Sequence, residues 1–137
     1  MKNLFTLTAA IELGADVALI SFPSAAVKSL LGSGLDTSAA VTLGRVAGVA
    51  LLTLGVACWL ARYDAQSCAA RGLVSAMVLY NLGAASILAF AGFGSGSTSI
   101  ALWPAVVLHT AMAVWCIASL RSKRVNGGNG NRRSHYG

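Results

Sequence analysis

Four long apolar stretches limit the folds that this sequence can adopt. They cover about residues 4–22, 38–61, 69–93 and 99–120. About 20 apolar residues in a helix span the roughly 30 Å hydrocarbon core of a bilayer, and a helix satisfies its own backbone hydrogen bonds there. Barrel strands would be shorter and would alternate between polar and apolar residues. The pattern predicts an all-α, polytopic membrane protein built as a bundle of four transmembrane helices.

Composition agrees with this interpretation. Hydrophobic residues make up 56% of the chain and charged residues only 10%, whereas soluble domains carry roughly 25% charged residues. The 137 residues are enough for one domain. We expect a transmembrane domain over residues 1–121 and a basic, Gly/Asn-rich tail over residues 122–137, irregular from about residue 125.

The segment after the first span has its own structural signals. Pro23 suits the first turn of a new helix, and Gly32-Ser33-Gly34 provides an end to it. We therefore expect a short interfacial helix here. Glu12 and Asp16 interrupt the first apolar stretch, which argues for a retained first helix and against a cleaved signal peptide.

The distribution of positive charge predicts the orientation in a membrane. Lys2, Arg62, Arg71 and the tail fall on one side of the bilayer, and Lys28 falls on the other. The positive-inside rule then places both termini in the cytoplasm. No basic face is interleaved with aromatic residues, so nucleic acid is not an expected partner. The cations expected to contact anionic lipid headgroups or a partner subunit are Arg121, Lys123, Arg124, Arg132 and Arg133.

Several polar residues lie inside the predicted spans, where a charged side chain costs several kcal/mol, on the order of 2.5–3.5 on insertion scales. Counting residues from the span ends places Asp16 about 9 Å and Arg45 about 10 Å deep from the same side. This agreement predicts an Asp16–Arg45 ion pair. In an alternative arrangement, Arg45 reaches both Asp16 and Glu12.

Glu12, Asn81 and His109 all fall near the middle of their spans. We expect these three residues to form a buried polar cluster. One interpretation is structural, since such groups fix the register of helices in a bundle. Another is a site that binds and releases protons, and a third is contact with a small molecule or quinone.

Motifs for catalysis or cofactor binding are absent from the sequence. It has no Ser–His–Asp set, phosphate-binding loop or HExxH motif, and only His109 lies inside a span, which argues against haem. Cys58, Cys68 and Cys116 form no CxxC pair and are best interpreted as packing residues. We expect no catalytic residue, no metal ligand and no cofactor.

Small residues recur at four-residue spacing, which allows membrane helices to approach closely. The stripes are Ala10-Gly14-Ala18, Gly44-Gly48 and Ala101-Ala105-His109-Ala113.

The layout resembles that of small, uncharacterised bacterial four-helix membrane proteins of the broad DoxX-like kind. The likeness covers residues 4–120, and it implies a compact membrane bundle without a settled activity. It is carried by Glu12-Leu13-Gly14, by Pro23 before Leu30-Leu31-Gly32, by Gly44-Arg45 with Gly48, by Tyr80-Asn81, and by Leu102-Trp103-Pro104-Ala105 with His109.

A second likeness is to small multidrug transporters, which also have four short helices with a Glu in the first. Here that Glu is Glu12 in Ile11-Glu12-Leu13-Gly14, whereas Asp16 and Arg45 depart from the pattern.

The expected function is a noncatalytic accessory or oligomeric component of a membrane complex, with another copy or other membrane subunits as partners. Alternatives are a proton-coupled small-molecule transporter that uses Glu12 and a quinone-associated redox helper.

Overall fold

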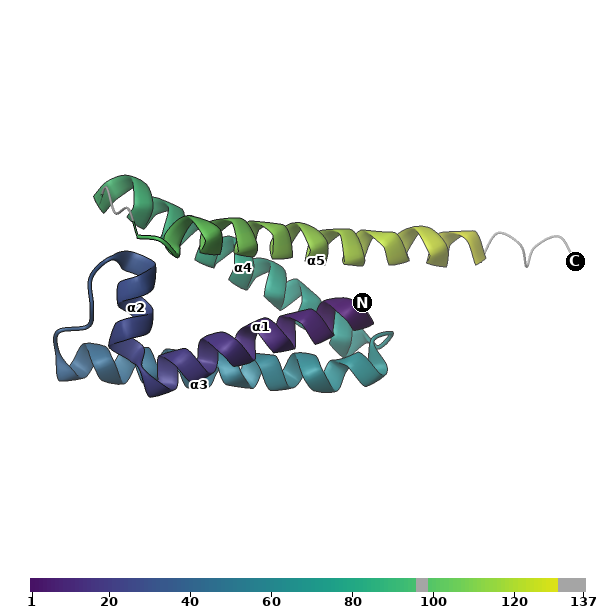
Figure 1. The fold of residues 1–137 in the computed structure, drawn as a ribbon. Coiled ribbons are helices and arrows are strands. Elements are labelled where there is room, and N and C mark those ends of the chain that lie inside the picture. The colour runs from purple at the N-terminus through teal and green to yellow at the C-terminus, as the bar shows by residue number, and fades with distance from the viewer. Residues whose placement is uncertain (96–98, 131–137) are drawn as a thin grey trace, which may run out of the picture.

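The computed structural model describes residues 1–95 and 99–130, with side chains described up to residue 94 and from 99 to 122. All regular elements in these ranges are helical (Figure 1). They are α1 (Lys2–Ser21), α2 (Pro23–Leu31), α3 (Ser38–Ala61), the 3-10 turn η1 (Arg62–Asp64), α4 (Cys68–Ser95) and α5 (Leu102–Gly130). The predicted all-α class and the short helix after the first span are confirmed.

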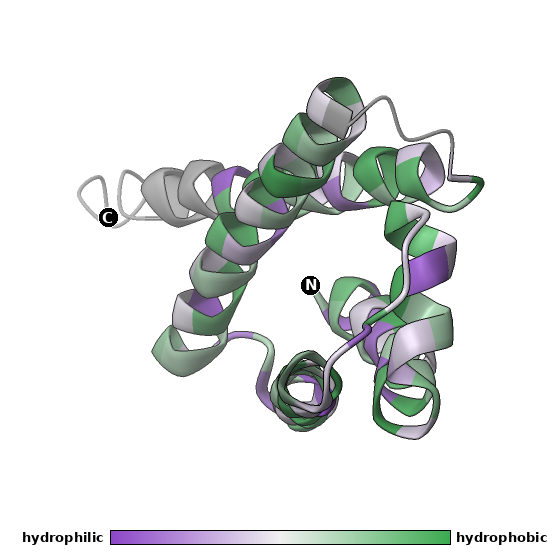
Figure 2. Ribbon diagram, turned by 90° about the vertical axis from the view of Figure 1, so that its left-hand side faces the viewer, coloured by the Kyte–Doolittle hydropathy of each residue, from purple (hydrophilic) through white to green (hydrophobic). Residues whose placement is uncertain are grey.

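The chain is a multi-pass membrane protein. Four of its helices, α1, α3, α4 and α5, are long and apolar enough to cross a bilayer. Large apolar side chains cover the outside of the bundle, as for Leu79 (76% exposed), Phe90 (81%) and Ile100 (88%). Figure 2 shows that apolar residues make up most of the long helices in the part of the chain that is coloured. Such a surface is stable against lipid tails and would not be stable against water.

Local sequence signals set the ends of α2 and the start of α3. Pro23 occupies the first turn of α2, where its missing N–H is not needed. Gly32 follows α2 with φ of 82°, a left-handed conformation that favours glycine. The Thr37 hydroxyl accepts a hydrogen bond of 3.1 Å from the Ala40 N–H and caps α3.

The helices are arranged as two pairs that diverge from one end of the bundle. α1 packs mainly on α3, and α4 packs mainly on α5. The pairs meet at the end that holds the N-terminus, here called the core end, and diverge toward α2, here called the α2 end (Figure 1). At the core end all four long helices contribute to one buried cluster: Leu4, Phe5, Ala9, Cys58, Ala70, Val74, Met77, Met112 and Cys116.

Glycines on α3 let this helix approach the end of α1 and the start of α2 closely. A methyl group at Gly48 would lie 2.8 Å from Ile20 Cγ1 and 3.2 Å from the Ile20 backbone nitrogen, and one at Gly44 would lie 3.1 Å from Pro23 Cβ. The predicted packing role of Gly44 and Gly48 is confirmed. By contrast, the stripe through Gly14 does not face a neighbouring helix: all three of its residues are exposed, and a methyl group at Gly14 would meet nothing within 4 Å.

The fourth span continues further than the sequence suggests. We expected it to end near residue 120 and the chain to become irregular from about residue 125, but α5 runs to Gly130 and projects past the core end (Figure 1). Extending an existing helix costs far less than starting one, so an established helix can pass through Gly and Asn residues that disfavour a new helix. The rest of the predicted tail, residues 131–137 with Arg132 and Arg133, lies outside the described residues.

Candidate functional site: a cleft between the two helix pairs

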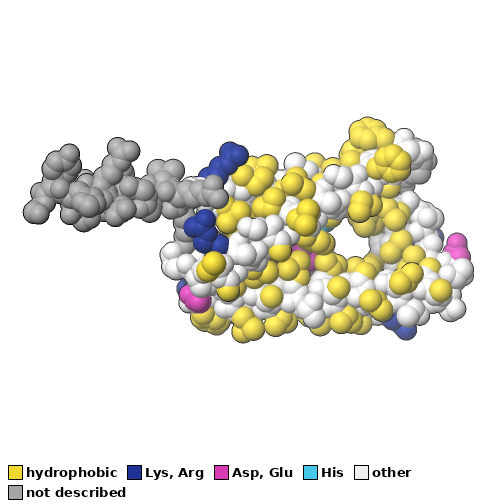
Figure 3. Space-filling view, turned by 180° about the vertical axis from the view of Figure 1, so that it is seen from behind, with side chains coloured by type: hydrophobic (Ala, Val, Ile, Leu, Met, Phe, Trp, Pro, Cys, Tyr) yellow, Lys and Arg dark blue, Asp and Glu magenta, His cyan; other side chains and the backbone are white. Residues whose placement is uncertain are grey.

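Divergence of the two helix pairs leaves a cleft in the half of the bundle toward α2. Its cavity has a volume of about 410 Å³. In the space-filling view an opening passes through the molecule between the pairs (Figure 3). The lining comes from α1, α2, α3, α4 and α5: Ile11, Glu12, Ala15, Leu19, Leu30, Leu51, Tyr80, Ala84, Ile87, Leu88, Ala105, Leu108 and His109.

Both ends of the cleft are covered, so it opens sideways. The buried cluster fills the core end. At the other end α2 contacts the start of α5: the Ser29 carbonyl accepts a hydrogen bond of 3.3 Å from the Ala101 N–H and another from the Ser99 hydroxyl. Leu30 of α2 contributes to the cleft wall. A lateral opening in a membrane helix bundle faces the lipid tails.

Glu12 and His109 form the polar floor of the cleft, and His109 is hydrogen-bonded to the buried Asn81. The Asn81 amide nitrogen donates to the Met77 carbonyl at 2.9 Å, and its side-chain oxygen lies 2.9 Å from His109 Nδ1. Since the Asn81 oxygen can only accept, His109 Nδ1 carries the proton and donates in this bond. In the neutral ring, Nε2 then remains as an acceptor. Tyr80 packs against the imidazole in a T-shaped contact at 5.7 Å between ring centroids.

Glu12 joins this floor from α1. It lines the large cleft, and it also lines a small cavity of about 10 Å³ together with Asn81 and His109. That small cavity has room for at most about one water molecule, so the three side chains lie close to one another. The structure thus places Glu12 beside Asn81 and His109, and a hydrogen bond joins Asn81 to His109.

The predicted Asp16–Arg45 pair is wrong. Neither carboxylate oxygen of Asp16 has a hydrogen-bond partner among the side chains and backbone that the structure describes, and the Arg45 side chain is exposed. Asp16 lies across from Leu52 on α3, and Arg45 lies seven residues earlier, about 10 Å along the helix axis. The depth estimate failed because it assumed that the first and second spans end together. Instead, Gly44 lies beside Pro23, so the first turns of α3 extend past the end of α1.

The predicted cations lie at the core end where they are described. Arg121 lines a surface pocket of about 290 Å³ between α4 and α5, together with Arg71. Lys123 and Arg124 belong to the α5 extension, and their side chains are outside the described set.

The small residues that leave space in the cleft were not predicted from the sequence. Ala15, Ala84 and Ala105 come from three different helices, and their small side chains leave room between the cleft walls. Only Ala105 belonged to a stripe that was recognised in advance. Leu30 was missed because α2 was assigned to the membrane surface and not to the wall of a cavity.

The arrangement suits binding of a mostly apolar molecule that carries one hydrogen-bonding group. The walls are apolar, and the floor offers a carboxyl group and an imidazole nitrogen. In the part of the chain that the structure describes, no group of three or more His, Cys, Asp or Glu side chains is placed to hold a metal ion. The sequence matches no family model, no curated protein and no solved structure.

Proposed function

We propose that this protein is a noncatalytic membrane component that binds a lipid-soluble small molecule in the cleft between its helix pairs. The observation that carries the proposal is a cavity of about 410 Å³ with apolar walls and a floor formed by Glu12 and His109, with Asn81 hydrogen-bonded to His109. Binding pockets for small molecules have this character: mostly apolar, with a few convergent polar groups. The lateral opening favours a ligand that arrives from the bilayer.

Hydrogen-bond roles narrow the chemistry of that ligand. Asn81 occupies the Nδ1 proton of His109, so neutral His109 offers only an acceptor. Charged Glu12 is also an acceptor, and a neutral carboxyl group has acceptor capacity as well. The floor therefore suits a ligand with a hydroxyl or N–H donor, such as a hydroquinone, a phenol or a long-chain alcohol.

The test is to identify what the protein retains from the membrane. Native protein is extracted in polymer-bounded bilayer discs, and mass spectrometry measures the small molecules that remain with it after washing. Ala84→Trp places a large ring in the cleft wall, whereas Ala76→Trp places the same ring on the exposed side of α4. We expect one defined compound in native protein and in Ala76→Trp, and its loss in Ala84→Trp.

Two results would refute the binding proposal. One is the absence of any stoichiometric compound in native protein. The other is equal retention in both Trp variants, which would place the compound outside the cleft. Helicity measured by circular dichroism controls for folding of the variants. If a compound is found, Glu12→Gln and His109→Leu should weaken its retention.

A second candidate function is proton-coupled transport of the same kind of molecule. It is favoured because an ionisable side chain, Glu12, contacts the cavity, and because hydrogen bonds to the Ser29 carbonyl join α2 to the segment before α5 at the α2 end. Transport requires proton release when the substrate binds. Ligand-linked proton release from purified protein that disappears in Glu12→Gln would favour transport, and binding without proton release would favour the noncatalytic component.

We also propose that the core end faces the bacterial cytoplasm. Lys2, Arg62, Arg71 and Arg121 all belong to this end, and the α2 end holds Lys28 and Arg45. The positive-inside rule then places both termini in the cytoplasm. The pocket shared by Arg71 and Arg121 suits an anionic lipid headgroup on that side. Assembly with further copies or other subunits remains a prediction from the sequence.

A further inference from the structure

Asp16 is a buried carboxyl group without a partner in the described part of the chain. Its side chain is 1% exposed, and neither carboxylate oxygen has a hydrogen-bond partner among residues 1–94 and 99–122. Buried polar groups in proteins nearly always have one. Asp16 lacks a hydrogen-bond partner in either protonation state, because a charged carboxylate needs donors and a neutral carboxyl group needs an acceptor for its O–H. Among the described residues, Asp16 therefore lacks the partner that a buried carboxyl group needs, and a bound molecule can supply it.

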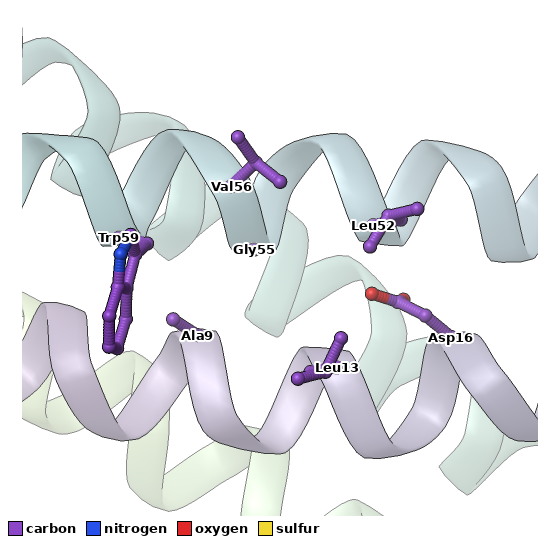
Figure 4. A pocket seen from close by; sticks show the side chains of 7 residues that line it. All are labelled: Ala9, Leu13, Asp16, Leu52, Gly55, Val56 and Trp59. Carbon is purple, nitrogen blue, oxygen red and sulfur yellow. The ribbon is translucent and has the colours of Figure 1, made fainter.

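The carboxyl group lies at the base of a groove between α1 and α3 (Figure 4). The groove has a volume of about 140 Å³, and its walls are otherwise apolar. Two small residues, Ala9 and Gly55, leave the space: a methyl group at Gly55 would lie 3.8 Å from Asp16 Oδ2. The lining residues are Ala9, Leu13 and Asp16 from α1 and Leu52, Gly55, Val56 and Trp59 from α3.

This groove is distinct from the cleft between the helix pairs. Glu12, one turn earlier on α1, lines the cleft, and Asp16 lines the groove. The rim of the groove is exposed on the outside of the bundle, with Leu13 54% and Val56 50% accessible. A molecule dissolved in the bilayer therefore reaches the groove without entering the cleft.

We propose that this groove binds a small lipid-soluble amine in its ammonium form. The ammonium group would donate hydrogen bonds to Asp16 and neutralise its charge, and such charge-assisted bonds are the stronger ones. The apolar part would lie against Leu13, Leu52 and Val56. A metal ion fits less well, because Ca²⁺ or Mg²⁺ requires six or more oxygen ligands and Asp16 is the only acidic side chain of the groove. Both oxygens are covered in this conformation, so the groove side chains must shift when the amine binds.

The probe for this site is 2-phenylethylamine, titrated into purified full-length protein in detergent and followed by isothermal titration calorimetry. Its neutral counterpart, 2-phenylethanol, has a similar shape without the charge. We expect saturable binding of the amine, weakened about 10- to 100-fold by Asp16→Asn, the range expected for hydrogen bonds to a charged group. Asp36→Asn, an exposed site outside the helices, is the matched control and should bind normally.

Several outcomes would overturn the amine site: no saturable binding, equal binding by Asp16→Asn, or equal binding of the alcohol. If Asp16→Asn does not fold, Val56→Trp takes its place, because it narrows the exposed rim and leaves the carboxyl group intact. Unchanged binding by Val56→Trp would then refute the proposal. Ala84→Trp should leave amine binding unchanged, so failure at the cleft and failure at the groove are distinguishable. Loss of amine binding in Ala84→Trp as large as in Asp16→Asn would place the amine in the cleft.

Discussion

Replacing Gly48 by Ala should push α1 and α3 apart. The added methyl group would lie 2.8 Å from Ile20 Cγ1, 3.1 Å from Leu19 Cβ and 3.2 Å from the Ile20 backbone nitrogen. A side-chain rotation can relieve only the first of these contacts. The other two involve the α1 backbone and a Cβ atom fixed to it, so relief requires separating the helices by a few tenths of an ångström. Overpacking of this kind typically costs about 1–3 kcal/mol.

The matched control is Gly14→Ala on α1. Both glycines are inside helices, and a methyl group at Gly14 meets nothing within 4 Å. Ala is favoured over Gly in a helix by about 0.8–1.0 kcal/mol, and this gain applies to both substitutions. It cancels in the difference, so we expect Gly48→Ala to be less stable than Gly14→Ala by about 1–3 kcal/mol.

The measurement is reversible unfolding in mixed micelles of a mild detergent and sodium dodecyl sulfate, followed by tryptophan fluorescence. Both variants and the native protein are titrated under identical conditions, and unfolding free energies are compared at a common micelle composition. Equal stability of the two variants would mean that α1 and α3 do not approach each other at Gly48. The register that places Asp16 opposite Leu52 would then lose its main support.

Three further predictions follow from local contacts and charge. Asn81→Leu and His109→Leu, made singly and together, should show a coupling free energy of about 0.6–1.7 kcal/mol in a double-mutant cycle, and zero coupling would contradict their hydrogen bond. Thr37→Ala removes the N-cap of α3 and should lower the unfolding free energy by about 1 kcal/mol in the same titration, so an unchanged value would exclude a capping role. A reporter active only in the cytoplasm should work when fused after Gly137 and fail when inserted within residues 96–98. The opposite pattern would reverse the orientation.

The fold could be predicted from sequence because it depends on length and hydropathy. Four stretches of sufficient length fix four helices in a bilayer, and Pro23 and Gly32 mark the short helix between the first two. The polar floor was also predictable. Groups such as Asn81 and His109 are costly near the middle of a span, so they turn inward and find one another.

The relation between α1 and α3 was not predictable in the same way. Residue counting assigns depth from the ends of apolar stretches, and it takes no account of the offset that α2 introduces between two helices. That offset separates Asp16 from Arg45. The rotation of each helix about its own axis could not be predicted either. Gly14 and Gly48 are the same residue type, but only Gly48 faces a neighbouring helix. The offset and the rotation both depend on packing between helices. In lipid no hydrophobic effect drives that packing, so the apolar pattern of the sequence does not report it.

Pairing of α1 with α3, and of α4 with α5, has a consequence for biosynthesis. α1 carries Glu12 and Asp16 but does not meet α3 until residue 61 has been synthesised. During that interval the two acids must remain near the insertion machinery or water, because lipid would penalise them. Once α3 enters, Asp16 is enclosed, and the first helix pair is complete before α4 begins at Cys68. We therefore expect assembly in two consecutive steps, with the cleft forming only when the second pair closes onto the first.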